Sequence, residues 1–127
     1  MASPIKIQEA IKIASEVFSV PHEKLIGKIR KPEIVNVRTI VVYVLRTYFR
    51  DNYFSYSFPL LRNYFNHNDH TSIVHYNQKA KKLIENNDII FIGQIQKYIE
   101  ALQNKGIDFV DRSKVQGPTN NNSMKYI

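Results

Sequence analysis

The sequence contains no cysteine and no tryptophan among its 127 residues. Without cysteine, neither a disulfide framework nor a zinc site built on thiolates can form. The chain also has no apolar run near the roughly 20 residues that a membrane-spanning helix needs, and its first residues, Met1 to Gln8, lack the long apolar segment of a signal peptide. We therefore expect a cytoplasmic protein with no membrane segment.

Glycine is also scarce, and its positions exclude one class of enzyme. The phosphate-binding loop of nucleotide hydrolases needs the pattern G-x-x-x-x-G-K-[ST], which Gly27, Gly93, Gly106 and Gly117 do not provide. The chain therefore cannot hydrolyse ATP through such a loop. We expect no enzymatic activity and no cofactor.

Acidic residues are few relative to basic ones. The chain has 18 Lys and Arg against 11 Asp and Glu, with a formal net charge of +7 and a pI near 9.6. Most of the excess lies between Lys24 and Arg50, a span whose single acid is Glu33. An ordinary solvated face is the plainer explanation, but this separation from acids favours an anionic partner such as nucleic acid or a membrane surface.

Apolar residues recur with helical spacing, and they predict about six helices in one all-α domain. The expected helices run from Pro4 to Phe18, His22 to Ile26, Pro32 to about Asn52, Ser57 to Phe65, Asp69 to about Asn86, and Asp88 to about Gly106. The Val-rich run from Ile40 to Leu45 could pass for a buried strand, but the length of the amphipathic pattern favours a helix. The domain would span residues 1–106. Residues 107–127, with Gly117-Pro118 and an Asn run, would form a flexible tail.

The stretch from Asn68 to His75 gathers small hydrogen-bonding side chains at the start of the fifth expected helix. Asp69 suits the N-cap, because its carboxylate can accept backbone N–H groups at the positive end of the helix dipole. A polar first turn followed by an amphipathic body is typical of a recognition helix that enters DNA by its N-terminal end. With the preceding helix and a tight turn at Asn66-His67-Asn68, it forms a candidate helix-turn-helix.

Other interpretations of the same residues stay open. His67, Asp69, His70 and His75 could ligate a metal ion in a small hydrolase or nuclease, although no second carboxylate cluster supports this. Asp69 could be a purely structural cap. The domain could also be a stand-alone transcriptional regulator, or a helical module that binds an acidic protein.

The chain contains, in order, Arg30, Pro32-x-Ile34-Val35-x-x-Arg38, Leu45-Arg46, Phe58-Pro59-Leu60-Leu61 and Asp69-His70-Thr71-Ser72-Ile73-Val74-His75. Over about Ile7 to Leu102 it resembles the C-terminal DNA-binding domain (domain IV) of the bacterial chromosomal replication initiator DnaA. The resemblance implies a small all-α domain with a helix-turn-helix of the Trp-repressor-like kind. It also implies binding to a short non-palindromic duplex, the DnaA box, as a monomer, in the nucleoid.

Carried over to this sequence, the resemblance implies two groups of DNA contacts. Asp69, His70, Thr71, Ser72 and His75 would lie at bases of the major groove or the adjacent backbone, and Arg30 would enter the neighbouring minor groove. Arg38, Arg46, Phe58 and Pro59 would lie near phosphates, and we add Lys28 and Lys31 from the basic loop that holds Arg30. The chemistry agrees, since Asp can accept from cytosine N4 and Arg is favoured in a narrow A·T minor groove.

The chain also departs from the family pattern. Asn68 stands where a basic residue is usual, Ser72 replaces the commoner Thr, Arg62, Asn66 and His67 replace small residues or Gly, and the aromatic connector from about Phe49 to Tyr56 is longer. The preferred DNA sequence is therefore expected to have drifted. The initiator's ATPase module has no counterpart here, so we expect sequence-specific binding of double-stranded DNA, in replication initiation or its regulation, without ATP hydrolysis.

Overall fold

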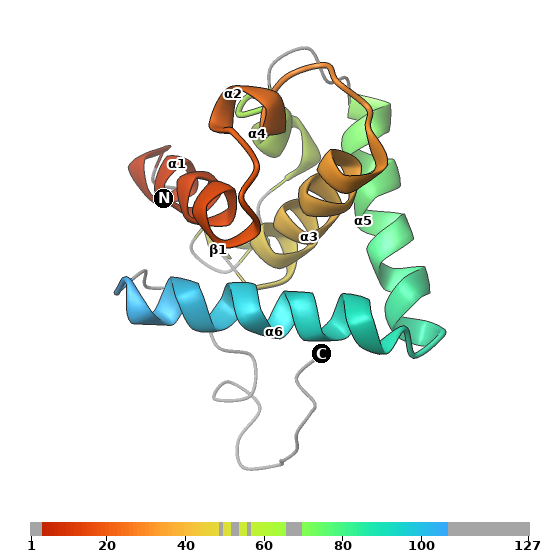
Figure 1. Cartoon of the computed structure of the whole chain (residues 1–127). Helices are drawn as coiled ribbons and strands as arrows, with labels where there is room; N and C mark the ends of the chain where they lie inside the picture. Colours follow the sequence, from red (N-terminus) through yellow and green to blue (C-terminus); the bar gives the residue numbers. More distant parts are fainter. Residues whose placement is uncertain (1–3, 49, 52–53, 56, 66–69, 107–127) are drawn as a thin grey trace.

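The computed structural model describes residues 4–48, 50–51, 54–55, 57–65 and 70–106. Over these residues the chain forms six α-helices and one two-stranded hairpin, so the all-α prediction is confirmed (Figure 1). The helices are α1 (Pro4–Phe18), α2 (His22–Leu25), α3 (Pro32–Tyr48), α4 (Phe58–Arg62), α5 (His70–Glu85) and α6 (Ile89–Asn104). No helix in these ranges is both long and apolar enough to cross a membrane.

Helix α3 is the centre of the domain. It packs against α1, α2, α5 and α6, and every side chain from Thr39 to Leu45 is buried. A helix that is apolar all round its circumference must be enclosed on all sides. This enclosure explains why the Ile40 to Leu45 run has the continuous apolar character of a buried strand although it folds as a helix.

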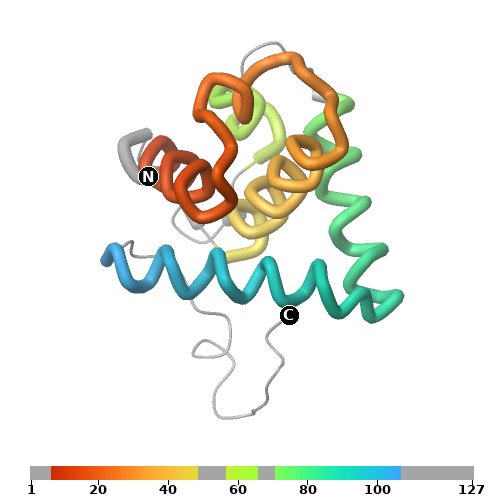
Figure 2. The backbone as a smooth tube through the Cα atoms, viewed as in Figure 1, coloured from red at the N-terminus to blue at the C-terminus, as the bar shows by residue number. Residues whose placement is uncertain are grey.

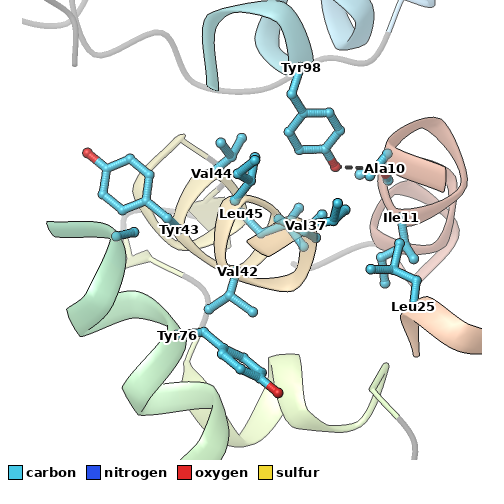
Figure 3. Packing of buried hydrophobic residues seen from close by; sticks show 14 of the residues in the cluster. Ala10, Ile11, Leu25, Val37, Val42, Tyr43, Val44, Leu45, Tyr76 and Tyr98 are labelled. Atoms are coloured by element: carbon cyan, nitrogen blue, oxygen red, sulfur yellow. Dashed lines mark hydrogen bonds between the residues drawn. The ribbon is translucent and has the colours of Figure 1, made fainter. Parts of the chain in front are cut away.

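The side chains around α3 form a single apolar core (Figure 3). Leu25 of α2 lies beside Ile11 of α1, and Val42 of α3 lies beside Tyr76 of α5. From α6, the Tyr98 hydroxyl donates a 2.6 Å hydrogen bond to the main-chain oxygen of Ala10 in α1. Burial of this phenol raises its pKa above the ordinary tyrosine value.

The corner between α5 and α6 is made by local signals that the sequence shows plainly. Asn87 adopts the left-handed conformation with φ of 59°, which Asn tolerates better than most residues. Asp88 then caps α6, because its Oδ1 accepts a 3.0 Å hydrogen bond from the main-chain N–H of Phe91. Figure 2 shows the chain turning sharply at this point, so that α5 and α6 run in very different directions. The prediction of a break and a cap at this dipeptide is confirmed.

The segment after α3 differs from the prediction of one long helix to about Asn52. Helix α3 ends at Tyr48, and β1 (Arg50–Asp51) then pairs antiparallel with β2 (Phe54–Ser55), with Arg50 opposite Ser55. Strands of two residues carry no alternating apolar pattern, so no periodicity in the sequence reveals them. The predicted tail, residues 107–127, lies outside the described residues.

Candidate nucleic-acid interface

The candidate helix-turn-helix combines α4 and α5, which pack against each other. The turn predicted at Asn66-His67-Asn68 lies outside the described residues. Ser57 begins α4, since its hydroxyl accepts a 3.2 Å hydrogen bond from the N–H of Leu60 and Pro59 lies in the first turn, a position that proline favours. Helix α4 ends at Arg62 rather than at Phe65. From Asn63 to Phe65 each N–H bonds the carbonyl three residues earlier, which is the tighter 3₁₀ pattern common at helix ends.

Helix α5 has one exposed side and one buried side at its first turns. Thr71 and His75 are exposed, whereas Ser72 and Tyr76 are buried at 8% and 4% exposure. Thr71 and His75 are four residues apart, so they lie on one face of the helix. Of the residues predicted to contact the major groove whose side chains are described, Thr71 and His75 are exposed to another molecule, and Ser72 is buried.

The basic loop between α2 and α3 passes over the same end of the molecule as the first turn of α5 (Figure 1). Its Arg30 donates a 3.1 Å hydrogen bond from Nη2 to the Ser72 hydroxyl. Arg30, Lys28 and Lys31 are all exposed. The structure therefore brings the predicted minor-groove arginine to the predicted recognition helix, although the two are 42 residues apart in the chain.

The structure corrects the prediction that Arg38 contacts a phosphate. Its side chain is fully buried, and its guanidinium donates hydrogen bonds to the main-chain oxygens of Lys24, Leu25 and Gly27 at 2.7 to 2.8 Å. A guanidinium that is covered by protein and occupied in this way is not presented to a phosphate. Arg38 is instead part of the interior that supports the basic loop.

Arg46 and Phe58, two of the predicted backbone contacts, lie together. The guanidinium carbon of Arg46, near the end of α3, is 4.0 Å from the centre of the Phe58 ring at the start of α4. This is a cation–π contact, which holds the charge over the ring. Both side chains are half-buried, and the neighbouring Pro59 is exposed.

Several predicted residues fall outside what the structure describes. His67, Asn68 and Asp69 are among them, and His70 is placed in α5 without a described side chain. Of the four residues considered as metal ligands, only His75 therefore has a described side chain. Within the described ranges, no three His, Asp or Glu side chains gather closely enough to hold a metal ion.

Two residues of this region were missed by sequence analysis. Tyr76 has its hydroxyl 3.5 Å from Nη1 of Arg38, and nothing in the sequence links these residues. The second is Gly27, which directly follows the short helix predicted from His22 to Ile26. A Cβ at this position would lie 2.7 Å from the carbonyl oxygen of Glu23, so the close backbone approach here requires glycine.

Comparisons with known proteins identify the family of the helix-turn-helix. A family model described as the bacterial DnaA protein helix-turn-helix matches residues 7–80, from α1 into α5. No solved structure is significantly similar to the chain.

Curated relatives extend the same similarity. The chain is 31% identical over 85 residues to the chromosomal replication initiator protein DnaA of Campylobacter curvus, covering 67% of this chain and 18% of the relative. It is 29% identical over 91 residues to the DnaA of a Synechococcus strain, covering 72% and 18%. It is 30% identical over 101 residues to that of Campylobacter jejuni, covering 80% and 21%. The chain thus spans about a fifth of the length of these relatives, and it belongs to the bacterial DnaA helix-turn-helix family.

Proposed function

We propose that the chain binds double-stranded DNA with sequence preference and acts in replication initiation or its regulation. Helix α5 would enter the major groove with its first turns, and Arg30 would enter the adjacent minor groove. The chain would bind a short site resembling the DnaA box, as a monomer. The family membership and the relatives named as replication initiators support the role.

The observation that carries this proposal is the bond between Arg30 and Ser72. It couples the exposed basic loop to the helix whose Thr71 and His75 are exposed. The major groove of B-DNA is about 12 Å wide and admits a helix, while arginine suits the narrow minor groove beside it. Recognition of adjacent major and minor grooves requires that α5 and Arg30 be held together at one end of the domain.

Phosphate contacts and base contacts would contribute differently to affinity and specificity. Lys28, Lys31 and Arg46 would neutralise phosphates and supply most of the affinity, with a strong dependence on salt. Thr71, His75, Asp69 and His70 would supply register and specificity at base edges. Ser72 is buried and would act by holding Arg30 through its hydroxyl. Arg38 is not proposed as a DNA contact, because its side chain is buried.

A binding titration tests the proposal. The protein is titrated against a DnaA-box duplex, a scrambled duplex of the same composition and heparin, at several salt concentrations, with and without a chelator. We expect the box duplex to bind most tightly. Thr71→Ala, His75→Ala and Asp69→Ala should each reduce the preference for the box over the scrambled duplex, by roughly 1 to 3 kcal/mol where a bidentate contact is lost.

The phosphate contacts have a separate signature in the same titration. Arg46→Ala should weaken binding to both duplexes equally and lower the slope of log K against log salt concentration by about 0.9. Lys12→Gln, which removes an exposed charge from α1, is the matched control and should leave the slope unchanged. Equal binding of both duplexes and heparin would indicate a module for acidic partners in general, and DNA cleavage that a chelator abolishes would indicate a metal-dependent nuclease.

A further inference from the structure

Arg38 is the largest fully buried side chain among the described residues. Its Nε donates to the Leu25 carbonyl oxygen at 2.7 Å, and its Nη2 donates to those of Lys24 and Gly27 at 2.8 and 2.7 Å. Burying a charge is costly unless hydrogen bonds compensate for the lost water. Here main-chain oxygens provide that compensation, so the position of the main chain and the position of this cation depend on each other.

The three carbonyls belong to the segment from which the basic loop departs. Lys24 and Leu25 are the last two residues of α2, and Gly27 follows its C-cap. The final carbonyls of a helix lack donors within the helix, and a planar guanidinium can satisfy several at once in a fixed geometry. A lysine ammonium has the same charge but concentrates its donors on one atom. It cannot reproduce the fork that spans these oxygens.

The conformation of this segment also depends on Gly27. Because a Cβ on Gly27 would lie 2.7 Å from the Glu23 oxygen, any larger residue must displace the backbone. Gly27 is only three residues before Arg30. A shift at Gly27 is therefore transmitted along a short piece of chain to the arginine that contacts α5.

Two side-chain contacts join Arg30 and Arg38 to α5. Arg30 reaches the Ser72 hydroxyl at 3.1 Å, and Nη1 of Arg38 lies 3.5 Å from the Tyr76 hydroxyl. Ser72 and Tyr76 are four residues apart and both buried, so they form one face of α5. Arg30 of the loop and Arg38 of α3 thus contact the buried side of α5, and Thr71 and His75 lie on its exposed side.

We propose that Arg38 is a positioning residue for DNA recognition. By holding residues 24–27 against α3, it fixes Arg30 relative to the first turns of α5, so that Arg30 and α5 meet the duplex as one rigid unit. The inference rests on the proposed DNA-binding function. It assigns to Arg38 an effect on affinity that passes through Arg30 and involves no contact between Arg38 and DNA.

A double-mutant cycle between Arg38→Lys and Arg30→Ala tests this effect. Arg38→Lys retains the charge, so a direct phosphate contact would survive largely intact. With positioning, Arg38→Lys should lower affinity for the box duplex roughly tenfold, and should have little further effect once Arg30 is already Ala. Heparin binding should not change. Equal losses in both Arg30 backgrounds would overturn the proposal.

Hydrogen exchange of the main-chain amides supplies a readout independent of DNA. In Arg38→Lys, the hydrogen-bonded amides from Lys24 to Gly27 should lose protection, while those of α1 and α6 should keep theirs. Full protection of Lys24 to Gly27 in this variant would also overturn the proposal. The control is Thr39→Val, which removes a buried hydroxyl bonded to the Val35 oxygen on the same helix. It should change neither loop exchange nor DNA affinity.

Gly27→Ala keeps the proposal testable if Arg38→Lys fails to fold. This variant displaces the loop while leaving Arg38 intact, and it should give the same loss of affinity and the same dependence on Arg30. Additive losses in Gly27→Ala and Arg30→Ala would count against positioning. If the unmodified protein shows no preference among duplexes and heparin, the proposed function fails and this inference falls with it. If it prefers the box but the cycle is additive, only the role of Arg38 fails.

Discussion

The two ends of the domain are held together by different kinds of interaction. Where α6 crosses α1, apolar side chains interlock, and the Tyr98 hydroxyl makes one buried bond to Ala10. Where the basic loop meets α5, a buried guanidinium bonds three carbonyls, and a second arginine bonds a serine. The first region, which we call the scaffold, is held mainly by apolar packing. The second region is held mainly by hydrogen bonds between polar groups.

The two kinds of interaction are expected to affect different properties, namely the free energy of unfolding and the position of the basic loop. Apolar burial stabilises in proportion to the area removed from water and has little directional preference. Hydrogen bonds weaken steeply when their geometry departs from the optimum, so a network of them fixes where the main chain lies. We therefore expect changes near α6 to act mainly on the free energy of unfolding, and changes near the loop to act mainly on DNA affinity.

The largest effect should come from opening a cavity in the scaffold. Ile95 in α6 is fully buried, and Ile95→Ala should lower the free energy of unfolding by about 2 to 5 kcal/mol, measured by urea denaturation. Ile90 on the same helix is 77% exposed, so Ile90→Ala should change it by less than about 0.5 kcal/mol. A large loss of DNA affinity in folded Ile95→Ala would break the proposed separation.

Alkaline pH should weaken the scaffold through Tyr98. Because burial raises the pKa of this phenol above the ordinary 10.0, the unfolded chain releases a proton above pH 10 that the folded protein retains. The folded state then holds more protons, and stability falls as pH rises, by at most about 1.4 kcal/mol per pH unit. Urea denaturation between pH 9 and 11 measures this slope, which should be smaller in Tyr98→Phe.

An intermediate effect is expected at the corner that joins α5 to α6. Asp88→Ala removes the side chain that caps α6 and should lower the free energy of unfolding by about 1 kcal/mol. Asp88→Asn should retain most of the stability, since asparagine is an equally good cap. DNA affinity of the folded protein should be the same in both variants. If Asp88→Asn loses as much stability as Asp88→Ala, the carboxylate acts through its charge and not as a cap.

The smallest effect is expected from the exposed ion pair between α1 and the end of α6. Lys105 Nζ lies 3.9 Å from Glu16 Oε1, with both side chains more than half exposed. Such pairs contribute little in water, so Glu16→Gln should change the free energy of unfolding by less than about 0.5 kcal/mol. A larger loss, absent at high salt, would show that charge as well as packing holds these helices together.

Features that depend on neighbouring residues were predictable from the sequence. Asn87 and Asp88 end one helix and begin the next through their own side chains and backbone, so their sequence position is sufficient to predict the corner. The helical spacing of α3 was likewise sufficient to choose helix over strand. The hairpin after α3 was not predictable, because four residues in two strands are too few to show a period.

The candidate site divides in the same way. Arg30 was expected to enter the minor groove next to the recognition helix, and this contact stays a prediction. The structure places its guanidinium within hydrogen-bonding distance of Ser72 in that helix. Arg38 was expected near a phosphate because the family resemblance implied that contact. Its burial follows from carbonyls that only the folded chain brings around it. Base contacts by Thr71 and His75 stay predictions, since exposure makes contact available and says nothing of the base.

The bond between Tyr98 and Ala10 joins residues 88 positions apart, and this separation has a consequence for the order of assembly during synthesis. The contacts that hold the basic loop lie between Lys24 and Tyr76, so all of their partners leave the ribosome before α6 does. Part of the apolar face of α1 stays uncovered until α6 emerges. The end proposed to read DNA can therefore assemble first, and the closure of α1 by α6 completes the domain.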